Sequence, residues 1–122
     1  MITVLATREG LLGHRTSSGY IIDDFVPFVA LPSKRACHDR ELVRIMNPLT
    51  GLFCYAFVLD VGPWNTSDDA YVYGGNRPQA ESGIDLFGRT TNKAGIDLGQ
   101  WVWKAIGMVD NSDVTWSFVA RV

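Results

Sequence analysis

The sequence has 122 residues, of which 47% are hydrophobic and 20% are charged, and its formal net charge is −2. A chain of this size and composition is typical of one globular domain that buries an apolar core without needing a disulfide framework or a structural metal. The eleven Lys and Arg residues are spread along the chain, which argues against nucleic acid as a partner. We therefore expect a single domain over residues 1–122.

The first third of the chain predicts short extended segments separated by loops. Residues 2–5 and 28–31 are apolar runs of strand length, and the second run is flanked by prolines. Residues 10–13 and 20–22 are further short strands or extended stretches. None of these segments has the apolar spacing of a helix.

The clearest local unit is a β-hairpin in the middle of the chain. Residues 41–46 form its first strand, residues 47–51 (Asn-Pro-Leu-Thr-Gly) form the turn, and residues 52–61 form the returning strand. The Gly-Pro pair at residues 62–63 ends that strand, because proline cannot donate a hydrogen bond to a ladder.

The last half of the chain adds a long insertion, one helix and a closing strand. Residues 65–93 are polar and rich in glycine, which predicts a long functional loop or a small inserted ribbon. Residues 100–108 have helical apolar spacing and end at a glycine, and residues 114–119 alternate as a strand does. The pattern as a whole predicts a mainly β protein, either a barrel or a sandwich, with one or two short helices.

Two aspartates are candidates for acid–base chemistry. Asp60 ends an apolar strand immediately before the Gly-Pro break, where partial burial would raise its pKa and suit it to be a general acid or base. The alternative is that Asp60 only caps a turn. Asp97 is the second candidate, and its alternative role is to support the start of the following helix.

The insertion offers candidate binding residues. The aromatic rings of Trp64, Tyr71 and Tyr73 would be flat platforms for sugar rings, or would simply fix the loop in place. Glu81 and Asp85 are weaker candidates for substrate binding, with solvated loop charges as the alternative.

Metal and cofactor sites are not indicated. The two histidines, His14 and His38, show no zinc-site spacing with Cys37 and Cys54, so we expect no metal. No phosphate-cradling loop, nucleophile elbow or dinucleotide fingerprint is present, and we expect no cofactor. The two cysteines could pair in an oxidising compartment or pack as free thiols.

Neither a membrane span nor a signal peptide is expected. The longest apolar runs, such as residues 53–59, are too short to cross a bilayer as a helix. Residues 1–6 are apolar, but no basic residue precedes them and the polar residues 7–9 end the run. The protein would then stay in the cell that makes it or leave by another route.

Several motifs match one known family in sequence order. Residues 13–19 (Gly-His-Arg-Thr-Ser-Ser-Gly) are similar to its Gly-x-x-Thr-Ala-Ser-Gly, and residues 29–32 fall where its alanine-rich stretch precedes a hairpin. Residues 43–51 resemble its Val-x-Val-x-Asn hairpin, residues 60–63 its Asp-x-Gly-Pro, and residues 95–98 its Ile-Asp-Leu segment. Together these motifs resemble the double-psi β-barrel family of rare lipoprotein A and the expansins.

The resemblance implies a six-stranded double-psi β-barrel with a polysaccharide-binding groove. Asp60 matches the key carboxylate of the family's lytic transglycosylases, which protonates the glycosidic oxygen of peptidoglycan and leads to a 1,6-anhydro product. Thr16 and Ser17 would bind substrate, and Asp97 would orient the sugar if it faces the same groove. A periplasmic or extracellular location is the family expectation.

Two other functions remain open from the sequence. The barrel could be a non-catalytic, expansin-like module that binds glycan through Trp64 and the long loop. It could instead be a structural component of a phage or a secretion system, which would agree with the missing signal peptide. A groove that exposes Asp60 beside a second polar group would favour the enzyme.

Overall fold

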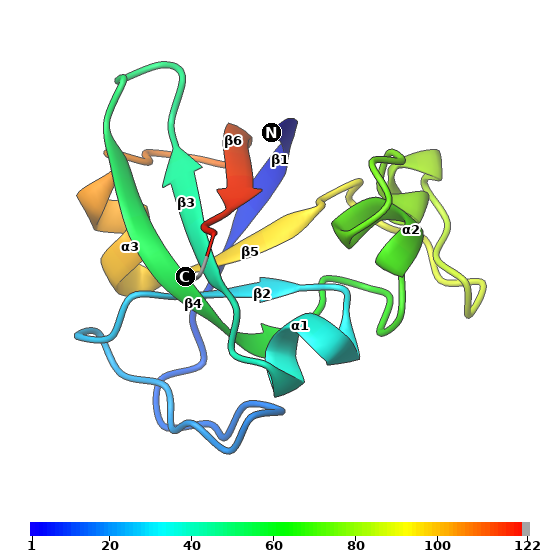
Figure 1. The fold of residues 1–122 in the computed structure, drawn as a ribbon, viewed down its shortest axis with the longest axis horizontal. Helices are drawn as coiled ribbons and strands as arrows, with labels where there is room; N and C mark the ends of the chain where they lie inside the picture. The colour runs from blue at the N-terminus through cyan, green and yellow to red at the C-terminus, as the bar shows by residue number, and fades with distance from the viewer. Residues whose placement is uncertain (121–122) are drawn as a thin grey trace.

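The computed structural model describes residues 1–120. Six strands close into a barrel in the order β1-β5-β2-β4-β3-β6 (Figure 1). The strands are β1 (Ile2–Glu9), β2 (Phe28–Leu31), β3 (Leu42–Met46), β4 (Phe53–Val61), β5 (Ile96–Gly99) and β6 (Ser112–Phe118). The expected mainly β, six-stranded barrel is confirmed. The single domain was expected over residues 1–122, and the last two of these residues lie outside the described part of the chain.

The barrel is mixed, with parallel and antiparallel neighbours. β1 runs parallel to β5 and β2 runs parallel to β4, while the other four pairs are antiparallel. The predicted hairpin is present as β3 and β4, with Leu42 opposite Phe57 and Met46 opposite Phe53. Its turn is tied to the rest of the fold, because the buried Asn47 side chain donates to the carbonyl of Ile106 at 3.0 Å.

Alternate residues of the strands fill the barrel interior. On β3, Val43 and Ile45 are fully buried while their neighbours are half-buried. The other strands contribute the same kind of small or branched apolar side chains, namely Val4, Ala6, Ala56, Val58, Ile96, Leu98 and Val114. The strand period of two therefore separates an apolar interior from an outer wall that is free to carry polar groups.

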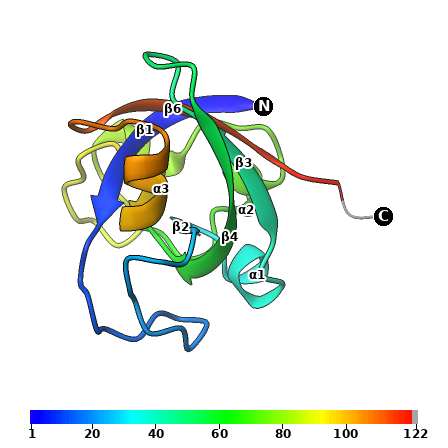
Figure 2. The ribbon, with the colours of Figure 1, turned by 90° about the vertical axis from the view of Figure 1, so that its left-hand side faces the viewer.

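Three short α-helices and one 3-10 helix lie outside the barrel wall. They are α1 (Lys34–His38), α2 (Asp69–Val72), α3 (Gln100–Ala105) and the 3-10 helix η1 (Gln79–Ser82). α3 lies on one side of the barrel, and α2 and η1 belong to a lobe on the opposite side (Figures 1 and 2). Of these helices, only α3 was predicted at its position. Residues 65–93, which were predicted to be a long loop or a small ribbon, form the lobe that contains α2 and η1.

β1 is longer than residues 2–5, and residues 10–27 form a long excursion rather than regular strands. One isolated bridge joins Arg15 and Ile21, so the extended stretches predicted at residues 10–13 and 20–22 do not enter the barrel. The excursion is held to the barrel where the Ser18 N–H donates to the carbonyl of Leu59 at 3.4 Å. This contact brings the Gly13–Gly19 motif against β4.

Within residues 1–120, no helix has the length and apolar character needed to span a membrane. Cys37 and Cys54 are free thiols, and both are buried. Burial raises the pKa of the Cys54 thiol to about 11. The structure therefore agrees with the packed-thiol alternative for these two residues.

Candidate functional site

The two predicted aspartates lie in one row across the barrel wall. Asp60 of β4 is the register partner of Ala30 of β2, and Ala30 is in turn the partner of Asp97 of β5. Asp97 is also the partner of Thr7 of β1. Residues in one row project to the same face of a sheet, so both carboxylates share the outer wall of the barrel.

Glu9 adds a third carboxyl group to this face. It follows Thr7 by two positions on β1, and the strand period of two gives both side chains the same direction. Its Oε2 atom is buried and has no hydrogen-bond partner. An ionised carboxylate would be costly there, because burying an unpaired charge is strongly unfavourable.

Glu9 therefore holds its proton. Burial raises the pKa of Glu9 to about 9, and a hydrogen-bonding interaction with Asp60 and the negative charges of Asp60 and Asp97 act in the same direction. At neutral pH the Glu9 side chain is a neutral carboxylic acid that can donate a proton.

Asp60 is the ionised partner of Glu9. The raised pKa expected from the sequence is wrong: burial acts in that direction, but hydrogen bonds from Glu9 and from two backbone N–H groups outweigh it and bring the pKa of Asp60 below its ordinary value. The N–H groups are those of Ser17 and Val61, which donate to Oδ1 at 3.0 and 2.9 Å. Backbone donors of this kind favour the charged form of a carboxylate.

The pKa of Asp97 lies between those of Glu9 and Asp60. Burial raises the pKa of Asp97 to about 6; the Thr7 hydroxyl, which donates to Oδ1, lowers it, and the charge of Asp60 raises it. Asp97 does not cap helix α3, because the N-cap residue is Gly99 and no side chain caps that helix. The structure thus excludes the helix-supporting alternative for this residue.

These three carboxyl groups have pKa values that are shifted differently: the pKa of Glu9 is raised to about 9, that of Asp97 is raised to about 6, and that of Asp60 is lowered. Glu9 is a protonated acid and Asp60 is an ionised base, and the two interact directly. A neighbouring pair whose environments separate its pKa values is the arrangement that assigns acid and base roles in enzymes.

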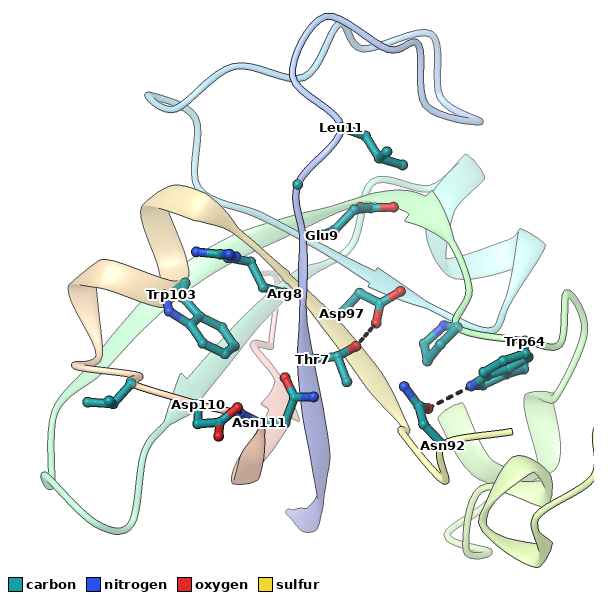
Figure 3. Close-up of a pocket in the computed structure, with 13 residues that line it drawn as sticks. Thr7, Arg8, Glu9, Leu11, Trp64, Asn92, Asp97, Trp103, Asp110 and Asn111 are labelled. Carbon is teal, nitrogen blue, oxygen red and sulfur yellow. Dashed lines mark hydrogen bonds between the residues drawn. The ribbon is translucent and has the colours of Figure 1, made fainter. Parts of the chain in front are cut away.

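An open groove of about 730 Å³ is lined by Thr7, Glu9 and Asp97 of this face, whereas Asp60 is not among its lining residues. Figure 3 shows Thr7, Glu9 and Asp97 on the groove side of β1 and β5, with Trp64 and Asn92 on one flank and Trp103 on the other. The groove walls thus combine carboxyl groups with aromatic rings, which suits a polar ligand that has apolar faces.

Trp64 is held in a fixed orientation at the edge of the groove. Its Nε1–H donates to Asn92 Oδ1 at 2.9 Å, and Arg89 donates to its carbonyl at 2.7 Å. The Arg89 guanidinium also lies 5.8 Å from the Trp64 ring centroid. The structure therefore places this predicted platform residue at the groove, with its ring orientation already determined.

Of the two loop residues predicted to bind substrate, Ser17 adjoins the site through its backbone. Its N–H holds Asp60, and the residue is exposed. Thr16 is buried and its hydroxyl hydrogen-bonds the Ser18 hydroxyl at 3.0 Å. Thr16 therefore stabilises the loop that positions Ser17.

The two tyrosines predicted as sugar platforms lie elsewhere. Tyr71 is only 2% exposed; its hydroxyl donates to the carbonyl of Gly95 at 2.9 Å and accepts from Trp116 Nε1 at 2.8 Å. Tyr73 stacks on Phe118, with their ring centroids 5.0 Å apart. Neither ring lines the groove. Tyr71 can pack in the core because its hydroxyl both donates and accepts a hydrogen bond there.

The two acidic residues predicted in the insertion stabilise the lobe. Glu81 forms an ion pair with Arg77, which lies four residues earlier in the chain and before the 3-10 helix η1. Asp85 is buried and accepts hydrogen bonds from the backbone N–H groups of Phe87 and Arg89, each at 2.9 Å, and from the Arg89 side chain at 2.6 Å. Asp85 is thus the centre of a tight turn, and neither residue lines the groove.

Glu9 is the site residue that the sequence did not indicate. The polar residues 7–9 were interpreted as the end of the first apolar run, whereas β1 continues through them. Following the alternation of Thr3, Leu5, Thr7 and Glu9 would have placed Glu9 on the outer face of a strand. In the described residues 1–120, no three His, Cys, Asp or Glu side chains are grouped so as to hold a metal ion.

The chain therefore forms a closed, mixed β-barrel whose outer wall carries two interacting carboxyl groups with opposite pKa shifts. The chain belongs to the family described as a domain of unknown function (DUF8814), whose model matches residues 1–117. No curated protein matches the sequence.

Proposed function

We propose that this protein is a glycan-cleaving enzyme of the lytic transglycosylase type, in which Glu9 is the proton donor and Asp60 is the base. The observation that supports this most directly is that Glu9, a protonated carboxyl group that lines an open groove, has a hydrogen-bonding interaction with the ionised Asp60, which does not itself line that groove. Peptidoglycan is the proposed substrate, because the order of the sequence motifs resembles that of rare lipoprotein A. The same resemblance supports a double-psi arrangement of the six strands.

The contact between the two carboxyl groups favours internal transfer over hydrolysis. Glycoside hydrolases place a sugar ring between two carboxyl groups, roughly 5 to 9.5 Å apart. Glu9 and Asp60 interact directly and leave no such space between them. The pair therefore acts as one unit on one side of the glycosidic bond.

The proposed step balances without water. Glu9 donates its proton to the glycosidic oxygen as the bond from the anomeric carbon to that oxygen breaks. The 6-hydroxyl oxygen of the same sugar bonds to the anomeric carbon, and its proton goes to Asp60. The product is a 1,6-anhydro sugar, and transfer of the proton from Asp60 to Glu9 restores the starting state.

Two other groove residues support this step. At neutral pH Asp97 is largely ionised, and its negative charge would stabilise the positive charge that develops on the sugar ring. Trp64 offers a preoriented ring on which a sugar can stack.

The test compares the release of soluble products from purified peptidoglycan by the wild type, Glu9→Gln and Asp60→Asn, analysed by mass spectrometry. Asp113→Asn is the matched control, because Asp113 is an exposed carboxylate on β6. We expect anhydro-muropeptides from the wild type and the control only. Products from Glu9→Gln at the wild-type rate would refute the assignment of the acid.

A second candidate function is a non-catalytic glycan-binding module. The specific observation in its favour is a row of exposed aromatic rings on the outer face of β4, where Phe53, Tyr55 and Phe57 are 50%, 48% and 43% exposed. Large exposed apolar surfaces commonly mark binding sites. If the wild type sediments with insoluble peptidoglycan but releases nothing, this function replaces the enzymatic one.

A further inference from the structure

A second cavity, which we call the basic pocket, lies next to Asp60. It has a volume of about 620 Å³, and its polar walls include Ser17, Ser18, Lys34, His38, Arg40 and Thr66. The same cavity is lined by Val61. Because Ser17 and Val61 supply the two N–H groups that hold Asp60, the basic pocket and the carboxyl row share a wall.

The two cavities have opposite electrostatic character. The groove is lined by three acidic residues, Glu9, Asp97 and Asp110, and by one cation, Arg8. In the described chain, no Asp or Glu is among the residues that line the basic pocket. The cations in its walls are Lys34 and Arg40, with His38 beside them.

Arg40 is positioned between the loop and the pocket. Its guanidinium donates to the carbonyl of Ser18 at 3.5 Å, and its backbone adopts a positive φ of 45°. The pKa of the Cys37 thiol is raised, first by burial and then by the charge of Asp60, while Arg40 acts in the opposite direction. Cys37 at the pocket wall therefore lies within electrostatic reach of both charges.

This combination of groups fits an oxyanion. Lys and Arg form charge-assisted hydrogen bonds to carboxylates, and hydroxyl groups such as those of Ser18 and Thr66 supply further donors. Both carboxylates and phosphates are oxyanions of this kind. The proposed peptidoglycan substrate carries carboxylates on its muramic acid sugars, so a carboxylate is the occupant that agrees with the proposed function.

We propose that the basic pocket binds the carboxylate of an acidic sugar in the glycan chain that lies across Asp60. This inference rests on the proposed function, because it assumes a glycan in the groove. It adds the requirement that the sugar next to the cleaved bond carries a carboxylate, so that Lys34 and Arg40 determine which bond in the chain is placed at Asp60.

The test measures binding by calorimetry with two matched ligands. One is a β-1,4-linked tetrasaccharide of alternating N-acetylglucosamine and N-acetylmuramic acid, and the other is the same tetrasaccharide with its carboxylates reduced to alcohols. Binding is measured in the Glu9→Gln background so that no turnover occurs. We expect about tenfold tighter binding of the acidic form, as one charge-assisted contact allows, and a loss of this preference when the salt concentration is raised.

Two substitutions locate the preference. Lys34→Gln removes an exposed cation of the pocket, and Arg40→Asn removes the guanidinium while keeping a residue that tolerates a positive φ. Both should bring the two affinities to within a factor of about two, whereas Lys104→Gln, at an exposed position of α3, should keep the full preference.

The outcomes separate this inference from the proposed function. Equal affinity for the two ligands, or an unchanged preference in Lys34→Gln, would overturn the basic pocket as a carboxylate site even if the wild type cleaves glycan. Stronger competition by inorganic phosphate than by acetate would overturn the choice of a carboxylate. A clear preference in a protein that cleaves nothing would support the basic pocket while refuting the enzymatic proposal.

Discussion

Asp60 and Asp97 are held on either side of one residue, since each is the register partner of Ala30 in β2. Neighbouring strands are about 4.8 Å apart, so the backbones of the two aspartates are separated by roughly 10 Å. Ala30 itself is only 1% exposed, so the position between the two aspartates is covered by packed atoms. The spacing of the two carboxylates is therefore determined by the barrel wall itself and not by a mobile loop.

Replacing Glu9 by Gln should change how stability depends on pH. The pKa of Glu9 is about 9 in the folded protein against 4.5 as its ordinary value, so the folded state binds extra protons between these two values. The free energy of unfolding of the wild type therefore falls as the pH rises through this range. Gln at position 9 cannot titrate, so Glu9→Gln should not show this fall. The difference in the free energy of unfolding, variant minus wild type, should therefore be about 1–3 kcal/mol more favourable to the variant at pH 8 than at pH 5. Urea unfolding at both pH values measures this, and an effect that is the same at pH 5 and pH 8 would contradict the assigned proton.

Catalytic activity should follow a bell-shaped pH profile. On the acidic side, activity falls first as Asp97, whose pKa is about 6, takes up a proton, and then as Asp60, whose pKa is lower than usual, does so. The alkaline limb reflects loss of the Glu9 proton near pH 9. Initial rates of anhydro-muropeptide release between pH 3 and pH 10 measure the profile. If Glu9→Gln keeps a measurable residual rate and that rate still falls near pH 9, the alkaline limb belongs to a group other than Glu9.

Thr7→Val should raise the pKa of Asp97. The Thr7 hydroxyl donates a hydrogen bond to the carboxylate and stabilises its charged form, and valine keeps the shape of the side chain without the donor. We expect a pKa above the present value of about 6, measured by NMR titration of the labelled carboxyl carbon. Thr3→Val is the control, because Thr3 lies on the same strand but hydrogen-bonds Thr115. An equal shift in both variants would show that the effect is not specific to Asp97.

Tyr71→Phe should destabilise the fold without affecting glycan binding. The substitution leaves the buried Trp116 indole N–H and the Gly95 carbonyl without their partner, which costs about 1–3 kcal/mol. Thermal unfolding and sedimentation with peptidoglycan report the two properties separately. Tyr55→Phe, at an exposed position on β4, should leave stability within about 0.5 kcal/mol. If Tyr71→Phe loses binding to peptidoglycan at a temperature where the variant is fully folded, Tyr71 contacts the ligand and the structural role assigned to it is wrong.

Local patterns in the sequence predicted the elements that have a regular period. The β3–β4 hairpin, helix α3 and strand β6 all lie where alternation or helical spacing placed them, because these elements bury one face against the barrel interior. Helix α1 has only five residues and depends on the Ser33 side chain, which accepts from the Ala36 N–H at 3.1 Å. A helix that short has no period to detect, and its tertiary surroundings decide whether it forms.

The site was only partly predictable for a different reason. Asp60 and Asp97 could be selected singly because each ends or follows an apolar run, but their common row depends on the strand order, which no local pattern encodes. Tyr71 lies in a polar segment and was expected to be exposed, yet its hydroxyl has partners 24 and 45 residues away. Contacts at such separations, like the one between Glu9 and Asp60, become visible only in the folded chain.

The three carboxyl groups come from β1, β4 and β5, which are far apart in the sequence, so the site is complete only late in the synthesis of the chain. No fragment that ends before residue 97 contains the full set, and the strands that carry the three groups are joined through the pairing of β1 with β5, β5 with β2 and β2 with β4. Under the proposed function, a nascent chain would pass most of its synthesis without the means to attack a polymer. The appearance of turnover would then report that β5 has joined the barrel, so an activity assay would also measure folding.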